Sequence, residues 1–566
     1  MRQCPCARVE WNDGPVGDAV RSSLEGRLKQ FVRDEESEPV ALFSPEAKAV
    51  SDRGDWYGEH LGKWTIAAHH AYRRTGDPEL CETLRRVVDY VVAQQEPSGY
   101  LGTYRAGAAC RFSSNESEEV RTWDLWTHAW TILGLLKVGQ TQAAARVGDL
   151  ILRTFGARTA TPLDLGNHAG LSSSVIIEPL AELTLATGDE RYTAFALEIV
   201  EELERRLGFL SKTDVAEIGT GKAYQILWNL VGLVALYRAT GEARLLKTAE
   251  RLWTNVAEHH LTPTGGPWGG IAGHKEVFNA KGFFSPYGMV ETCSAATWMT
   301  LSRELFRVTG SVRYVEAFET TLMNSLLGAI DENGADWIYF TFPNGRRNNT
   351  YHWACCKSSG AMALEESSDM VATLDEGGVR VNLLVPCRVD TGRDGLTLQI
   401  DENSVGLRLN ASQRFVLSVR VPHWSVLNGV SVGGQRIDNP PVSNGYLSID
   451  RQWHDGDRIE LSLERPIRVV PYTYTVDHHG QEVVRMDYAY LSCGPYVFAT
   501  GLIDGYKKEE TLRLPRLTPD SPFRLNGEGI DLHAPGRTPI SFLPYYRAGG
   551  CHEGAWRTTW LQIAWQ

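Results

Sequence analysis

The sequence has few cysteines, fewer basic than acidic residues and no long apolar run. Ten cysteines in 566 residues are too few for a disulfide scaffold, so close cysteines suggest a metal or catalytic site sooner than bridges. The 57 basic against 69 acidic residues give a net charge of −12, which argues against nucleic acid and anionic membranes as partners. No apolar stretch of about 18 residues occurs and the first residues lack a secretory pattern, so we expect a soluble, cytoplasmic protein.

Residues 21–374 follow a helical pattern, with apolar side chains at i, i+3, i+4 and i+7. A glycine between an apolar helix end and a polar residue recurs along this region, and such a glycine ends one helix where the polar residue opens the next. The glycines are Gly76, Gly139, Gly188, Gly241 and Gly310. With further helices expected around Trp353 to Thr373, the pattern predicts an (α/α)6 barrel, a toroid of six helical hairpins; an open solenoid is the alternative.

The pattern changes near residue 375 to short alternating segments such as FVLSVRVP and YLSIDRQW, separated by Gly, Asn and Asp turns. Residues 375–566 are therefore predicted to form an antiparallel β-sandwich region, as one large or two smaller sandwiches. Residues 1–20 include CARVEWND, which can add a strand to it. We expect an α+β multidomain protein, in which the β region either covers one barrel mouth or forms a homodimer.

The most informative side chains are three cysteines and a glutamate from two segments. GMVETCSAATWM holds Glu291 and Cys293, and YHWACCKSSG holds Cys355 and Cys356. Three thiolates and a carboxylate fill a tetrahedral zinc site. The spacing is not that of a zinc finger, so buried core cysteines without a metal remain an alternative on the residues alone.

These motifs resemble those of glycoside hydrolase family 127, the β-L-arabinofuranosidase group. The resemblance rests on Glu276-Val-Phe, Glu291-Thr-Cys293 and Cys355-Cys356 in this order, and on flanking pieces such as DWYGEHLGKWTIAA, LTPTGG and PYYRAGG. It implies an (α/α)6 barrel followed by a β-sandwich. It also implies a retaining, exo-acting hydrolase of terminal β-L-arabinofuranosides or a related sugar, with an oligosaccharide or glycoside as substrate.

The resemblance further implies a role for each motif residue. Cys355 would be the nucleophile, kept as a thiolate by Zn²⁺ that Glu291, Cys293, Cys355 and Cys356 hold together. Glu276 would be the general acid/base that protonates the leaving group and then deprotonates water. Without the flanking motifs, Glu276 in its Gly-rich loop would be interpreted as a solvated side chain.

Several other side chains are candidates for contacting the sugar. His128 stands among tryptophans in TWDLWTHAW and suits either a sugar pocket or a hydrogen-bonded core position. His168, in LGNHAGLSSS, suits either a pocket or a loop strut. Tyr104, Tyr224 and Arg346 could contact sugar hydroxyls or a carboxylate, although such side chains more often belong to the surface or the core, and Lys222 is the last candidate.

The chain departs from the family pattern at Gly221-Lys222-Ala223-Tyr224, where characterised members carry Gly-His-Ala. The charge of Lys222 motivates the hypothesis of an acidic or differently branched sugar. Two alternatives to the hydrolase stay open. One is an α/α-barrel epimerase, uronide hydrolase or lyase, which would use a His or Tyr base and no zinc thiolates. The other is a noncatalytic carbohydrate-binding protein with a structural zinc, which four saturated ligands would suit.

Overall fold

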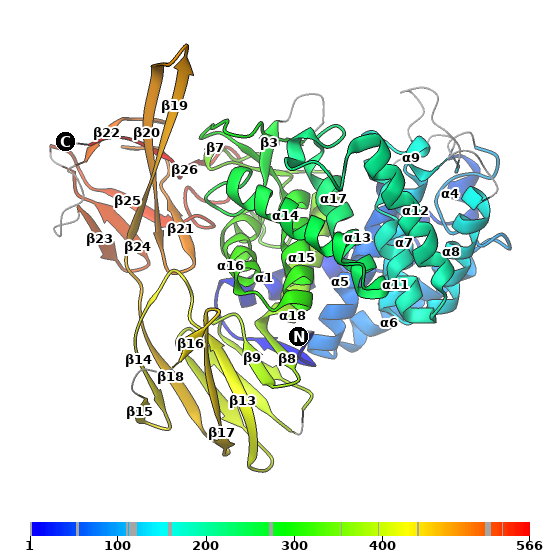
Figure 1. Cartoon of the computed structure of the whole chain (residues 1–566), viewed down its shortest axis with the longest axis horizontal. Helices are drawn as coiled ribbons and strands as arrows, with labels where there is room; N and C mark the ends of the chain where they lie inside the picture. The colour runs from blue at the N-terminus through cyan, green and yellow to red at the C-terminus, as the bar shows by residue number, and fades with distance from the viewer. Residues whose placement is uncertain are drawn as a thin grey trace.

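The computed structural model of the chain contains a helical domain and two β domains (Figure 1). The helix expected to start around Trp353 begins outside the described residues, whereas α17 (Cys355–Glu366) and α18 (Ser368–Val371) lie within them. The structure describes residues 3–51, 56–108, 111–112, 122–156, 161–270, 276–352, 354–393, 395–437, 441–514, 522–534 and 536–565.

Six inner helices form a closed ring. Each contacts the next one along the chain, and the last contacts the first, so the (α/α)6 barrel is confirmed and the open solenoid is wrong. Helix α13 shows why such helices lie inside, because its residues from Ala223 to Leu236 are all buried and nearly all apolar. The inner helices are α5 (Glu59–Thr75), α7 (Asp124–Lys137), α11 (Ile177–Thr187), α13 (Ala223–Thr240), α15 (Thr292–Thr309) and α17 (Cys355–Glu366).

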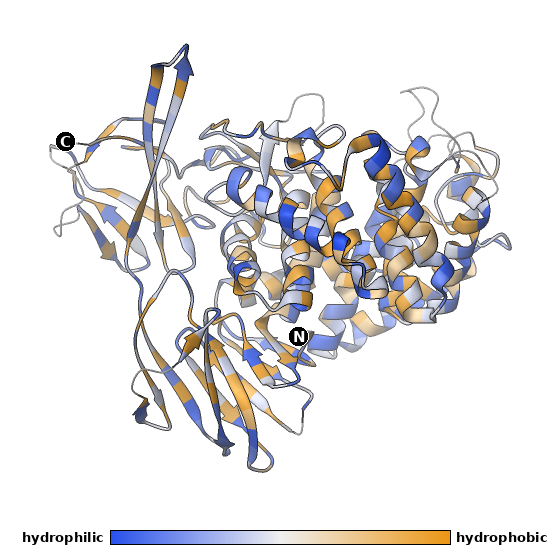
Figure 2. Cartoon of the chain, in the orientation of Figure 1, coloured by the Kyte–Doolittle hydropathy of each residue, from blue (hydrophilic) through white to orange (hydrophobic). Residues whose placement is uncertain are grey.

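The outer helices bury one face against the ring and expose the other, and Figure 2 shows hydrophilic and hydrophobic residues alternating along them. Five of them follow their inner partners in sequence. The sixth inner helix, α17, instead contacts α1 (Pro15–Ser23) and the π-helix η1 (Leu24–Leu28) from the start of the chain. The other outer helices are α6 (Pro78–Ala93), α8 (Thr141–Gly156), α12 (Glu190–Leu207), α14 (Ala243–His259) and α16 (Val312–Thr320).

The five glycines expected between paired helices all lie there, with φ between 67° and 79°. This left-handed conformation costs glycine little, which explains why the chain places it at each turn. The polar residues that follow behave less uniformly. Asp77 and Asp189 accept hydrogen bonds from the first turn of the next helix, whereas the side chains of Glu242 and Ser311 make no such bond.

The first β domain is a two-sheet sandwich, shown below the barrel's left side in Figure 1. The N-terminal segment supplies an edge strand to each sheet. One sheet has the order β1 (Cys4–Pro5), β8 (Ala372–Asp375), β9 (Gly378–Val381), β13 (Gln413–Arg420), β17 (Tyr446–Trp453) and β16 (Val442–Ser443). The other has the order β15 (Gln435–Ile437), β14 (Val426–Val432), β18 (Arg458–Glu464), β12 (Ser404–Arg408), β11 (Thr397–Asp401), β10 (Cys387–Asp390) and β2 (Arg8–Trp11).

The sequence predicted an antiparallel sandwich, and this is wrong for one pair of strands. β9 and β13 run parallel. The chain crosses to the opposite sheet for β10, β11 and β12 between them, so β13 returns in the direction of β9. Local alternation of apolar residues predicts a strand but not this crossover.

The last part of the chain forms a separate eight-stranded sheet with its own apolar core. Strands β19 (Arg468–His478) and β20 (Gln481–Cys493) form a long hairpin that projects from it (Figure 1). A second parallel pair joins β22 (Leu512–Leu514) and β27 (Leu561–Trp565). The remaining strands are β21 (Tyr496–Ala499), β22 (Leu512–Leu514), β23 (Phe523–Asn526), β24 (Gly529–Leu532), β25 (Ile540–Pro544) and β27 (Leu561–Trp565).

Small strands link the barrel mouth to this C-terminal sheet. One four-stranded sheet has the order β4 (Val277–Phe278), β3 (Trp268–Gly270), β5 (Met289–Glu291) and β6 (Phe340–Thr341). Nearby, β7 (Asn344–Arg346) pairs with β26 (Trp556–Thr558), and the buried Asn344 amide donates to the Trp560 carbonyl at 2.8 Å. Among the described residues, no helix combines the length and apolar character needed to cross a membrane.

Candidate active site and metal site

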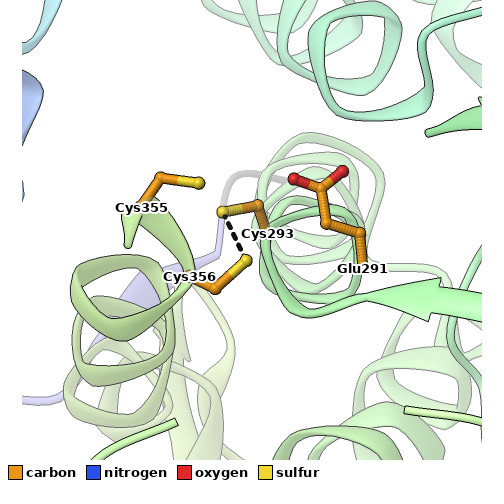
Figure 3. A group of neighbouring side chains, drawn as sticks. All are labelled: Glu291, Cys293, Cys355 and Cys356. Atoms are coloured by element: carbon orange, nitrogen blue, oxygen red, sulfur yellow. Dashed lines mark hydrogen bonds between the residues drawn. The ribbon is translucent and has the colours of Figure 1, made fainter. Parts of the chain in front are cut away.

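Three cysteines and a glutamate meet where two neighbouring inner helices begin. Glu291 ends β5 and Cys293 lies in the first turn of α15, while Cys355 and Cys356 open α17. All four side chains are buried, and their donor atoms lie within 4.8 Å of one another. Figure 3 shows the sulfur atoms and the carboxylate gathered in one place, with the sulfurs of Cys293 and Cys356 3.2 Å apart. The structure thus brings together the predicted metal ligands.

The protonation of this cluster indicates that it suits a cation. Hydrogen bonds with the Cys293 and Cys356 thiols lower the pKa of Cys355 well below its usual range. Burial raises the pKa of Cys293 and of Cys356 well above theirs, and raises the pKa of Glu291 to about 8. One thiolate is therefore favoured only while its neighbours stay protonated. A divalent cation bound by several thiolates would offset the cost of burying more than one negative charge. Three sulfurs with one carboxylate are a donor set that zinc accepts.

Lys222 and Glu276 lie beside this cluster. An isolated antiparallel bridge pairs Lys222 with Val277, which directly follows Glu276. The Lys222 ammonium donates to the Glu276 carboxylate and lies 3.6 Å from Oε2 of Glu291. Burial acts to lower the pKa of Lys222, but the carboxylates of Glu291 and Glu276 outweigh it and raise the pKa. The ammonium is therefore already bound by one side chain of the protein and lies close to a second.

Tyr339, which the sequence analysis did not single out, links Glu276 to Cys355. Its hydroxyl donates to Oε1 of Glu276 at 3.5 Å, and its oxygen lies 3.9 Å from the sulfur of Cys355. Glu276 itself has φ of 38°, a left-handed backbone that is uncommon for a residue with a side chain and recurs at functional sites. An aromatic residue just before a short strand carries no sequence signal that would distinguish it from an ordinary core tyrosine.

A second polar group, also absent from the sequence predictions, supports the cluster from inside the ring. The Lys63 ammonium lies 2.8 Å from Oε2 of Glu59 and donates to Oγ of Ser359 at 3.0 Å. That Oγ lies 3.3 Å from the sulfur of Cys293. Trp126 donates to the same Glu59 carboxylate at 2.5 Å, and burial raises the pKa of Glu59 to about 7. The available sequence signal was a pair of opposite charges four residues apart on a helix that the structure shows to be mostly buried.

Two of the proposed sugar contacts have partners inside the protein. His128 is fully buried, with Nδ1 2.7 Å from the Asp124 carbonyl oxygen and Nε2 3.3 Å from the Leu101 amide nitrogen. Tyr104 is also fully buried, and its hydroxyl accepts a hydrogen bond from the Trp123 amide at 2.9 Å. These surroundings match the core position that the sequence left open for each of them.

The other sugar candidates divide between the site and the surface. Tyr224 is buried beside the Lys63 ammonium, which lies 5.2 Å from its ring centre. His168 is half-buried, and its ring lies 6.3 Å from that of Trp123. Arg346 has 65% of its side chain exposed and lies 3.9 Å from Glu553 at the contact with the C-terminal sheet. The structure thus groups Tyr224 with the cysteine cluster and places Arg346 at a domain contact.

Comparisons with known proteins cover nearly the whole chain. The family description "Beta-L-arabinofuranosidase, GH127 catalytic domain" matches residues 9–369, and the description of the GH127 middle domain matches residues 378–465. The chain is 23% identical over 576 residues to a non-reducing end β-L-arabinofuranosidase of Bifidobacterium longum subsp. longum, over 88% of this chain and 84% of that protein.

Two solved structures share the fold. A GH127 β-arabinofuranosidase superposes with a TM-score of 0.78 at 20% identity, over 100% of this chain and 98% of the other. A GH127 β-L-arabinofuranosidase from Geobacillus stearothermophilus T6 superposes with a TM-score of 0.73 at 17% identity, over 98% of this chain and 100% of the other. These likenesses include the barrel and both β domains.

The catalytic-domain description covers more than half of the chain and includes the Glu-Thr-Cys and Cys-Cys segments whose side chains converge in the barrel. This match favours the hydrolase prediction over an epimerase, a lyase, an uronide hydrolase and a noncatalytic binding protein. The chain therefore belongs to glycoside hydrolase family 127 and is a glycoside hydrolase.

Proposed function

We propose that this protein is a retaining, exo-acting hydrolase that removes terminal β-L-arabinofuranosyl residues, with Cys355 as the nucleophile and Glu276 as the general acid/base. The observation that carries the proposal is the cluster of three thiols and one carboxylate beside a second carboxylate, with the Tyr339 hydroxyl between Glu276 and Cys355. The sugar is the one that the bifidobacterial relative, a non-reducing end β-L-arabinofuranosidase, acts on.

A zinc ion fits the donor set of this cluster. Glu291, Cys293, Cys355 and Cys356 would hold it, because their donor atoms are buried and within reach of one ion. When bound, Zn²⁺ supplies a deprotonated thiol at neutral pH without the need for a histidine base. Lys63 of α5 donates a hydrogen bond to Ser359 of α17, and Ser359 contacts Cys293. These contacts support the same cluster.

The proposed reaction has two steps. In the first, the Cys355 sulfur attacks the anomeric carbon, the glycosidic C–O bond breaks, and Glu276 gives its proton to the departing oxygen. In the second, water attacks the same carbon, Glu276 takes the proton from the water, and the C–S bond breaks. Two inversions at one carbon leave the anomeric configuration unchanged, and Glu276 returns to its starting state.

Lys222 has a positioning role in this proposal. Its ammonium is bound by Glu276 and lies close to Glu291, so it fixes the acid/base side chain and does not offer a free positive charge to the substrate. A uronic carboxylate would meet Glu276 and Glu291 as well as Lys222. The acidic-sugar hypothesis therefore loses its motivation, and a neutral sugar fits the site better.

The substrate is tested by initial rates on p-nitrophenyl furanosides and pyranosides of both anomers, with a p-nitrophenyl uronide added. We expect turnover of the β-L-arabinofuranoside and a rate on the uronide lower by about 100-fold or more, because a uronic carboxylate would lose its hydration there without a free cationic partner, and burying an unpaired charge costs several kcal/mol. Equal rates on the neutral and the uronic glycoside would contradict the role given to Lys222. Turnover of a different neutral sugar would correct the substrate and leave the mechanism in place.

The metal is tested by elemental analysis of the purified protein. We expect about one zinc per chain, and we expect a strong chelator to remove both the zinc and the turnover while lowering Tm, since an ion that binds only the folded state stabilises it. Cys293→Ser should lose the zinc, whereas Cys81→Ser, at a half-buried thiol on α6, should keep it. Full turnover of zinc-free protein would refute the proposal.

A further inference from the structure

An open groove lies outside the barrel, where α14 and α16 face the β domains. Its volume of about 600 Å³ is in the range of small-molecule sites. The loop before β14 and the strands β19 and β20 form its far wall. Its lining includes Trp268, Phe283, Phe284, Glu316, His423 and Tyr472.

The small sheet at the barrel mouth separates this groove from the cysteine cluster. Trp268 of β3 lines the groove, pairs with Val290 of β5 and packs with Val290 and Ala295. Successive strand residues point to opposite faces, so Glu291 projects away from the groove and toward the cysteines. No residue of the metal cluster lines the groove. A ligand bound there would therefore occupy a site of its own.

Aromatic rings form one wall of the groove and remain partly open to solvent. The ring of Phe284 lies 4.6 Å from that of Tyr472 and 5.3 Å from that of Trp560, and the ring of Phe283 lies 6.1 Å from that of Trp268. Phe283 is 52% exposed and Tyr472 is 37% exposed. Grouped aromatic rings that a folded protein leaves open in a concave surface offer flat apolar faces to a ligand.

The polar side chains of the groove select the kind of ligand. His423 lies 3.5 Å from Glu316, and His259 lies 3.8 Å from Glu258, so carboxylates and imidazoles stand beside the rings. The described residues that line the groove include no Lys and no Arg, so no permanently charged cation there would pair with a phosphate, sulfate or carboxylate, and each of the two imidazoles already has a carboxylate beside it. Hydroxyl groups, in contrast, can donate to carboxylates and exchange hydrogen bonds with imidazoles.

We propose that this groove is a second saccharide-binding site, which takes a neutral oligosaccharide and is distinct from the catalytic centre. The C–H face of a sugar ring packs on the aromatic wall around Tyr472 and Phe284, and its hydroxyls reach Glu316 and His423. The carboxylates of Glu258 and Glu316 repel acidic sugars. A glycan bound here is kept next to the barrel mouth, on the opposite face of the sheet that carries Glu291 into the catalytic centre.

Native affinity electrophoresis tests the groove, with soluble arabinan, galactan or glucomannan in the gel and polygalacturonate as the acidic comparison. We expect at least one neutral polysaccharide to retard the protein and polygalacturonate not to do so. Tyr472→Ala should raise the dissociation constant by about tenfold, since it removes one ring contact. Glu316→Gln should also weaken retardation, which provides a second variant if Tyr472→Ala fails to fold by circular dichroism.

Two controls separate this site from the catalytic one. Tyr506→Ala removes a 71% exposed aromatic ring of the same C-terminal domain outside the groove, and it should be retarded as the unchanged protein is. Cys355→Ala should lose turnover but keep the retardation. The proposal is overturned if no neutral polysaccharide retards the protein, if both groove variants are retarded fully, or if polygalacturonate retards it more strongly.

Discussion

Replacing Cys355 with alanine is expected to lower kcat/KM on the β-L-arabinofuranoside by about 10⁴-fold or more, because none of the described side chains around it can take over nucleophilic attack. Cys293 and Cys356 lie close by, yet both side chains are fully buried whereas Cys355 is 8% exposed, so neither sulfur is open to the sugar. The hydroxyl of Tyr339 also lies near Cys355, but burial raises its pKa, so it is a poor nucleophile. The measurement is the initial rate of the purified variant against the unchanged enzyme.

Cys81→Ala is the matched control for that variant, because Cys81 is a half-buried thiol on an outer helix and should tolerate the change with full turnover. Binding of the released sugar is measured on the same preparations, and so is the melting temperature. A Cys355→Ala variant that keeps its turnover would eliminate the cysteine mechanism. A variant that is merely unfolded would instead favour a purely structural metal.

Replacing Glu276 with alanine is expected to lower kcat by about 10²- to 10⁴-fold, and by an amount that depends on the leaving group. A good leaving group such as 2,4-dinitrophenolate needs no proton, so its departure should be least affected, whereas alkyl glycosides should be hardly cleaved. Azide should restore turnover of the activated substrate, because a small anion can enter the space of the lost carboxylate and attack without a base. The product identified by NMR should be a β-glycosyl azide.

The control for Glu276→Ala is Glu332→Ala, which removes an exposed carboxylate from a loop and should leave every rate unchanged. If Glu276→Ala slowed all leaving groups equally and azide had no effect, Glu276 would act by holding the site together and not by moving a proton. If the azide product had the α configuration, the reaction would not be retaining.

Local chemistry explains why the barrel could be predicted from the sequence. The left-handed conformation at Gly76 and at the four other turn glycines is a property of each glycine and its neighbours, so the pattern alone indicates where paired helices join. The pattern also indicates strands after residue 374. It could not indicate that β9 and β13 are parallel or that the last sheet has its own core, since both depend on the path between distant strands.

The site was predictable only where its residues formed a motif. Cys293 and Cys355 are far apart in sequence, and they meet because α15 and α17 are neighbours that begin at the same end of the ring. Tyr339 belongs to no motif, and Lys63 lies in the flanking piece DWYGEHLGKWTIAA without an assigned role, so only the folded chain shows their contacts with the cluster. His128 suited a pocket and a core equally well in the sequence, and its backbone partners became known only from the fold.

The pairing of the first strands with the sandwich affects how the protein is made in the cell. β2 needs β10 as its partner, and β10 is translated after the whole barrel. At roughly 5–20 residues per second, the start of the chain waits on the order of half a minute for that partner to leave the ribosome. Until then the edges of these strands stay unpaired and can bind wrong partners. Helices α1 and η1 likewise lack their contact partner until α17 has been translated. The helical domain therefore depends on strands that follow its last helix. A gene truncated after α17 would encode a chain in which β1 and β2 have no partner strands.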